Sequence, residues 1–97
     1  MKTIQLITKK NCSRCDLLKD WLKNRNISYE ELTIENEEVR NQLLEDKKFT
    51  QMFCDDMGCV IITPVLKIKE TGKFYAKRLF GMSGIREEFT QKLLEID

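Results

Sequence analysis

The sequence predicts a small α/β fold, and three observations support this. Its 97 residues are enough for one domain, so we expect 1–97 to form a single domain. Apolar residues alternate with period two in some stretches and recur at helical spacing in others, in the order β-α-β-α-β-β-α. Two cysteines, Cys12 and Cys15, fall where the first strand meets the first helix, and the chain has no histidine.

The first predicted elements are a strand over 3–8 and a helix that ends at Asn26. Apolar and polar residues alternate through the strand. Asn11 or Cys12 suits the N-cap of the helix, and Asp16 in its first turn complements the helix dipole. The apolar side chains that follow keep helical spacing: Leu18, Trp21 and Leu22.

A less regular second strand is expected over 28–34, and a helical segment opens at 36–38. The helical spacing of apolar residues in this segment is interrupted at 45–48 and resumes at Phe49. We therefore expect two short helices or one broken helix, ending at Gly58.

The last third of the chain predicts a β-hairpin followed by a helix. Strands are expected over 64–69 and 74–80, joined by a turn at 70–73 that contains a glycine. A loop follows at 81–84. One apolar stripe then marks the final helix, formed by Ile85, Phe89, Leu93 and Ile96.

Composition excludes several classes of function. Seventeen basic and sixteen acidic residues give a net charge of +1, which offers no bulk attraction for nucleic acid or an anionic membrane. No apolar run approaches the roughly 18 residues of a membrane helix, and the N-terminus is too polar for a signal peptide. We expect a monomer in the cytoplasm. In that compartment, cysteines are more often catalytic or metal-binding than part of structural disulfides.

The spacing of Cys12 and Cys15 suits thiol–disulfide exchange. Two intervening residues place Cys12 at the helix N-terminus and Cys15 one turn inside. Backbone N–H groups, the helix dipole and nearby cations favour the thiolate of Cys12, which would attack a substrate disulfide. Cys15 would then resolve the mixed disulfide. The alternative is a cysteine-ligated metal or iron–sulfur site, since a lone C-x-x-C also occurs in such proteins.

Three motifs together resemble the glutaredoxin family. Lys9-x-x-Cys12-Ser13-Arg14-Cys15 is similar to the family's Lys-x-x-Cys-Pro-Tyr-Cys, and Ile62-Thr63-Pro64 resembles its Thr-Val-Pro segment. Residues 81–84 fall where glutaredoxins carry Gly-Gly-[Cys/Ser]-Asp. The resemblance implies a thioredoxin-like fold whose four-stranded mixed sheet has the order 2-1-3-4, with strands 1 and 2 parallel, strands 3 and 4 antiparallel, and three or four flanking helices.

The resemblance also implies roles for residues around the cysteines. Pro64 would be cis and lie against Cys12, the backbone of Thr63 would pair with a bound thiol peptide, and Lys9 would face a carboxylate of that peptide. Arg14 would add positive charge. Ser83 and Gly84 would offer donors to the substrate, although the acidic residue of the family's last motif is missing.

Differences from the glutaredoxin motifs affect which electron donor we expect. Ser83-Gly84-Ile85-Arg86 resembles the Ser-Gly-Phe-Arg stretch of the glutaredoxin-like redoxins that serve ribonucleotide reductase and take electrons from thioredoxin reductase. The expected function is reduction of protein or glutathione mixed disulfides, with glutathione or a thioredoxin reductase as donor and no bound cofactor.

A second cysteine pair, Cys54 and Cys59, lies outside the glutaredoxin motifs. Three interpretations remain open from the sequence. The cysteines are small buried apolar residues, a second redox pair or disulfide, or half of a metal site that uses all four cysteines.

Overall fold

The computed structural model describes residues 3–82 and 84–95. A four-stranded sheet lies at its centre in the order β2-β1-β5-β6. The strands are β1 (Ile4–Thr8), β2 (Glu30–Thr33), β5 (Val65–Ile68) and β6 (Lys73–Tyr75). β1 and β2 are parallel, whereas β5 is antiparallel to both β1 and β6. This is the mixed sheet that the resemblance implied, and α/β architecture is confirmed.

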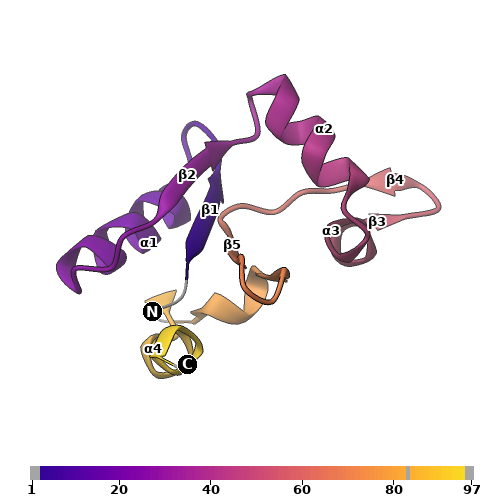
Figure 1. Ribbon diagram of the computed structural model, residues 1–97. Coiled ribbons are helices and arrows are strands. Elements are labelled where there is room, and N and C mark those ends of the chain that lie inside the picture. The colour runs from indigo at the N-terminus through magenta and orange to yellow at the C-terminus, as the bar shows by residue number, and fades with distance from the viewer. Residues whose placement is uncertain (1–2, 83, 96–97) are drawn as a thin grey trace.

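Helices cover the two faces of the sheet. They are α1 (Ser13–Asn24), α2 (Glu37–Glu45), α3 (Lys47–Phe53) and α4 (Glu87–Glu95). Figure 1 shows α1 and α4 on one side of β1 and β5, with α2 and α3 on the other. Asp46 separates α2 from α3 and caps α3 through its carboxylate, so the expectation of two short helices is confirmed.

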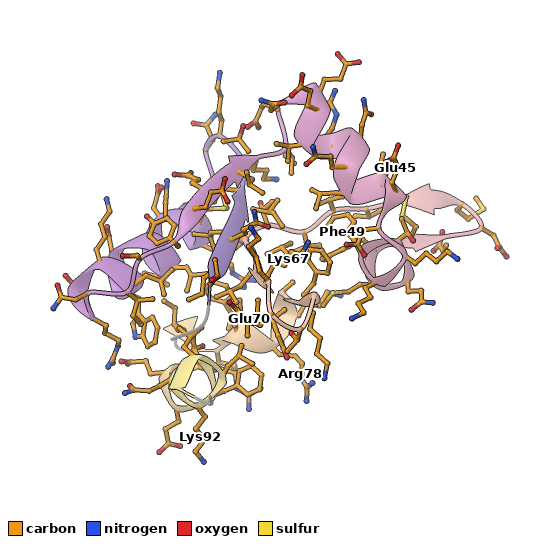
Figure 2. The ribbon with its side chains drawn as sticks, viewed as in Figure 1. Glu45, Phe49, Lys67, Glu70, Arg78 and Lys92 are labelled. Atoms are coloured by element: carbon orange, nitrogen blue, oxygen red, sulfur yellow. A yellow bond between two sulfur atoms is a disulfide. The ribbon has the colours of Figure 1, made fainter. Side chains whose placement is uncertain are left out.

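Alternation along β1 produces two apolar clusters, one on each face of the sheet. Ile4 and Leu6 pack with Leu18 and Leu22 of α1. Ile7 faces the opposite cluster with Phe49 of α3, and Figure 2 shows Phe49 pointing from α3 toward the sheet. Because helices pack on both faces, β1 and β5 are almost wholly buried and hold the segments at their ends in fixed positions.

The region after α3 differs from the sequence prediction. The helix ends at Phe53, and a short hairpin of β3 (Cys54–Asp55) and β4 (Gly58–Cys59) follows. Gly58 has φ +124°, a backbone angle that suits glycine in a tight turn as well as at a helix end. The sequence therefore located the glycine correctly but assigned it to the wrong structure.

The strand expected over 74–80 is also wrong in its second half. β6 ends at Tyr75, and Lys77–Leu79 form one turn of 3₁₀-helix (η1). The chain then makes a second hairpin from β7 (Phe80–Gly81) and β8 (Gly84–Ile85), where a loop was expected. Leu79 is buried three residues after Ala76, so the period-two pattern breaks at this point.

α4 is fastened to α1 by a polar cluster on the surface. The Glu87 carboxylate accepts hydrogen bonds from Trp21 Nε1 at 3.2 Å and from Arg25 Nη2 at 2.7 Å. The hydrogen bond from Trp21 and that from Arg25 lower the pKa of the Glu87 carboxyl. Trp21 also packs against the core, as its helical spacing predicted.

Candidate active site

Cys12 caps the N-terminus of α1. It has extended φ and ψ of −113° and 101°, and its Sγ accepts a hydrogen bond from the backbone N–H of Cys15 at 3.1 Å. Asn11 before it has φ +55°, a left-handed conformation that asparagine tolerates better than most residues. The loop thereby turns from β1 into α1 with the sulfur of Cys12 directed at the first turn of the helix.

Cys12 and Cys15 form a disulfide with a Cα–Cα distance of 5.2 Å. Cys12 keeps 8% of its surface exposed and Cys15 only 1%. The sulfur at the helix N-terminus is therefore the more accessible of the two, which is the difference that a nucleophile and a resolving thiol require.

Thr63 brings a second donor to Cys12. Its Oγ1 lies 3.4 Å from Cys12 Sγ, and both side chains are buried. A sulfur in a disulfide carries no proton, so the hydroxyl of Thr63 is the donor. The Thr63–Pro64 peptide bond is cis, as the resemblance implied. Sequence reasoning assigned Thr63 a backbone role only, and the contact of its side chain was missed.

The two cations of the motif lie in different surroundings. Lys9 is exposed in the loop between β1 and α1. Arg14 is exposed as well, and its guanidinium lies over the ring of Phe80, 5.3 Å from the centroid. Arg14 thus connects the cysteine motif to the β7–β8 hairpin.

The substrate-binding loop predicted at the C-terminal end is only partly described. Ser83 lies outside the described residues. Gly84 lies in β8 with φ +116°, and α4 begins three residues later at Glu87. The amide of Gly84 is therefore part of a hairpin, and its role as a donor to the substrate stays a prediction.

A hydrogen-bond network holds the start of the loop between β1 and α1. Thr8 Oγ1 donates to Glu31 Oε2 at 2.7 Å, and Lys19 Nζ donates to the same oxygen at 3.2 Å. The hydrogen bond from Thr8 is the main cause that lowers the pKa of the Glu31 carboxyl, and the hydrogen bond to Glu31 raises the pKa of Lys19. The backbone N–H of Lys10 donates to Glu35 Oε2 at 3.1 Å. These bonds fix the loop before Cys12 against β2 and the residues before α2.

The four cysteines do not gather in one place. Cys54 and Cys59 form their own disulfide, and Figure 1 shows their hairpin well away from α1, beyond α2 and α3. Cys59 is exposed and Cys54 half-buried, so the interpretation as small buried residues is wrong. Among the side chains that the structure describes, no three cysteine or acidic groups are close enough to hold a metal ion, which gives the four-cysteine metal site no support.

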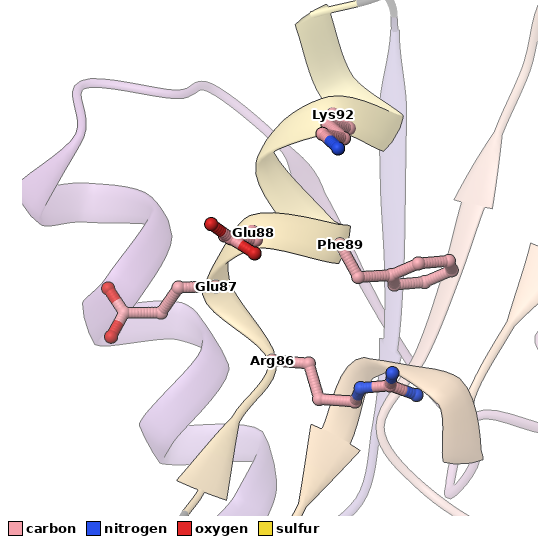
Figure 3. Close-up of a pocket in the computed structure, with 5 residues that line it drawn as sticks. All are labelled: Arg86, Glu87, Glu88, Phe89 and Lys92. Atoms are coloured by element: carbon pink, nitrogen blue, oxygen red, sulfur yellow. The ribbon is translucent and has the colours of Figure 1, made fainter.

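A hollow of ≈ 550 Å³ on α4 contains no cysteine. It is lined by charged side chains around Phe89, and in Figure 3 Glu87 points toward α1 while Phe89 points to the other side of the helix.

Among the described residues, no helix has the length and apolar character needed to cross a membrane.

The structure of the whole chain is similar to solved structures of other proteins. The thioredoxin-like protein BC3987 aligns with 94% of this chain and 99% of its own, at 27% sequence identity and a TM-score of 0.62. A mutant form of that protein aligns at 26% sequence identity and a TM-score of 0.64, and the alignment covers 96% of this chain and 100% of the mutant.

The chain has a thioredoxin-like fold. Glutaredoxin 1 from Francisella tularensis, in a complex with cacodylate, shares the fold at a TM-score of 0.59. That alignment covers 98% of this chain and 100% of the glutaredoxin at 15% identity, which shows the fold alone. No protein-family model and no curated protein matches this chain by sequence. The resemblance inferred from its motifs is nevertheless confirmed by the structural neighbours.

Proposed function

We propose that this protein is a thiol–disulfide oxidoreductase that reduces disulfides of proteins or mixed disulfides with glutathione. The observation that carries the proposal is the position of Cys12 Sγ. It accepts from the Cys15 amide at 3.1 Å and contacts the Thr63 hydroxyl at 3.4 Å, at the N-terminus of a 12-residue helix. Each of these features stabilises negative charge on sulfur.

The reduced protein would start the reaction through the thiolate of Cys12. That thiolate attacks one sulfur of the substrate disulfide, and the other sulfur leaves with the electron pair of the broken bond and takes up a proton. Cys15, which is one turn along α1, then loses its proton and attacks Cys12 Sγ. The second substrate thiol leaves, and the Cys12–Cys15 disulfide seen in the structure is formed. Two electrons and two protons pass to the substrate.

The surroundings of Cys12 support roles in substrate binding. We assign the backbone of Thr63, beside Pro64, to pairing with an extended peptide that carries the target sulfur. Lys9 is exposed next to the site and would attract a carboxylate of the substrate. Arg14 and Gly84 would lie on the other side of the site, since the Arg14–Phe80 contact brings the hairpin to the cysteine motif. Ser83, which lies outside the described residues, is proposed to bind the substrate on sequence grounds alone.

The electron donor is proposed to be a thioredoxin reductase or glutathione, in a cytoplasmic setting. An assay of NADPH consumption distinguishes the two. The oxidised protein is given either thioredoxin reductase or glutathione with glutathione reductase, and a disulfide substrate such as insulin is added. Turnover in at least one arm, abolished by Cys12→Ser, supports the oxidoreductase. No turnover in either arm by protein whose Cys12–Cys15 disulfide opens with dithiothreitol would contradict it.

A further inference from the structure

The reaction proposed for Cys12 leaves the Cys54–Cys59 disulfide unused. This second disulfide joins two directly opposed residues of the β3–β4 hairpin, whose Cα atoms are 3.9 Å apart. It lies beyond α2 and α3, away from α1 (Figure 1). Neither Cys54 nor Cys59 belongs to the two apolar clusters of the core.

The second disulfide is open to attack from solvent. Cys59 is exposed and Cys54 half-buried. Met57 at the tip of the hairpin is 95% exposed, and Val60 directly after Cys59 is 73% exposed. Thiol–disulfide exchange needs an incoming thiolate to reach one sulfur of the bond, and exposed disulfides are the ones that exchange readily.

Opening this disulfide would disturb only a small part of the fold. It closes a loop with a sequence separation of 5, and the constraint that a disulfide places on the unfolded chain grows with loop length. The hairpin itself has two residue pairs, Cys54 with Cys59 and Asp55 with Gly58. The nearby core, in which Phe49 packs with Val65 and Phe74, does not include either cysteine. The native sheet can therefore persist with the pair reduced.

We propose that Cys54 and Cys59 are a second redox-active pair, which exchanges with dithiols independently of Cys12 and Cys15. The fully reduced chain would then store four electrons rather than two.

The exchange is balanced with a dithiol as reductant. One thiolate of the reductant attacks Sγ of exposed Cys59, the Cys54–Cys59 bond breaks, and its electron pair leaves on Sγ of Cys54, which takes up a proton. The second thiol of the reductant loses its proton and attacks the mixed disulfide, releasing Cys59 as a thiol. The reductant becomes a disulfide, and two electrons and two protons reach the pair.

The state of the pair has a local structural readout. The backbone N–H of Val60 donates to the carbonyl of Phe53 at 2.9 Å, immediately outside the disulfide. Cys54 also lines a groove of ≈ 610 Å³ that includes Ile62, the neighbour of Thr63. Without the disulfide, the two ends of the hairpin are held by few bonds, so reduction should speed hydrogen exchange at Val60.

The test uses a variant that lacks the first pair, Cys12→Ser with Cys15→Ser. This protein is equilibrated without denaturant in buffers of reduced and oxidised dithiothreitol, quenched with acid and labelled with a maleimide mass tag. We expect two tags at the reducing end, none at the oxidising end, and the same curve in both directions. Far-UV circular dichroism should stay unchanged while exchange of the Val60 amide accelerates.

The matched control is Cys54→Ser with Cys59→Ser, which keeps the first pair. Reduced wild-type protein, freed of dithiothreitol, should reduce two equivalents of a small disulfide such as 5,5′-dithiobis(2-nitrobenzoate), and the control one equivalent. The proposal is overturned if the first variant accepts tags only after denaturant is added. It is also overturned if reduction melts the fold or cannot be reversed. Because this variant has no Cys12, these outcomes are independent of the proposed oxidoreductase activity.

Discussion

The hydroxyl of Thr63 lies 3.4 Å from the sulfur of Cys12, although 51 positions separate them in the chain. The contact exists because β5 pairs antiparallel with β1, so the start of one strand meets the end of the other. Cys12 follows β1 by a short loop, and Thr63 lies two residues before the start of β5. The sheet register thereby delivers a hydrogen-bond donor to a sulfur that already caps a helix.

Replacing Thr63 by valine should raise the pKa of the reduced Cys12 thiol. The hydroxyl would stabilise the thiolate, and loss of one hydrogen bond of about 1 kcal/mol corresponds to roughly 0.7 pKa unit. The rate of alkylation by iodoacetamide as a function of pH measures this shift. Thr63→Ser keeps the hydroxyl and should stay close to the wild type. Equal curves for all three proteins would remove the hydroxyl from the mechanism.

Serine variants should separate the two cysteines by role. In the Cys54→Ser, Cys59→Ser background, Cys12→Ser should abolish disulfide reduction because it removes the nucleophile at the helix N-terminus. Cys15→Ser should accumulate a mixed disulfide with the substrate, since the buried resolving thiol is gone. Mass spectrometry of the protein after exposure to an oxidised substrate detects this adduct. Accumulation in the Cys12→Ser variant instead would reverse the two roles.

Lys9→Ala tests the cation that precedes the nucleophile. Lys9 is exposed, so water and salt screen its charge, and we expect the pKa of Cys12 to rise by only a few tenths of a unit. Lys10→Ala is the matched control, because it removes an adjacent exposed cation from the same loop. Alkylation curves at low and high salt measure both effects. A shift that is the same in the two variants would show a general charge effect and no specific role for Lys9.

Glu31→Gln should make stability less dependent on pH. Hydrogen bonds from Thr8 and Lys19 lower the pKa of the Glu31 carboxyl in the folded protein, so its stabilisation is present above the ordinary pKa of glutamate. It is lost as pH falls through the lowered folded value. At pH 7 the variant should be less stable by at most about 1 kcal/mol, because the pair is partly solvated.

Urea denaturation at a series of pH values from neutral to about 3 checks the prediction for Glu31. The difference in unfolding free energy between wild type and variant should narrow toward acid pH. A difference that stays constant down to the lowest pH would assign the effect to packing instead of charge.

Local patterns predicted most of the fold. Alternation in β1, the capping position of Cys12 and the break between α2 and α3 are all set by neighbouring residues, and the structure confirms them. The errors lie where one residue type serves two structures. Gly58 suits a helix end or a hairpin turn, and only the pairing of Cys54 with Cys59 decides between them.

The site was less accessible to sequence reasoning, because it depends on contacts between distant segments. The cysteine motif identified Cys12 and Cys15, but nothing near Thr63 in the sequence shows that its side chain reaches Cys12. The contact between Arg14 and Phe80 depends in the same way on the position of the β7–β8 hairpin. One signal was available for that hairpin, since Ala76 and Leu79 are three residues apart and break the strand pattern.

The most direct measurement is the pKa of Cys12 in the reduced Cys54→Ser, Cys59→Ser variant. The rate of alkylation is followed against pH, and peptide mapping confirms that Cys12 carries the label. The helix N-terminus and the two donors predict an inflection well below 8.5, within the range of roughly 3.5–7.5 that activated cysteines show. An inflection near 8.5, or a Cys12 that does not react in the folded protein, would contradict the account.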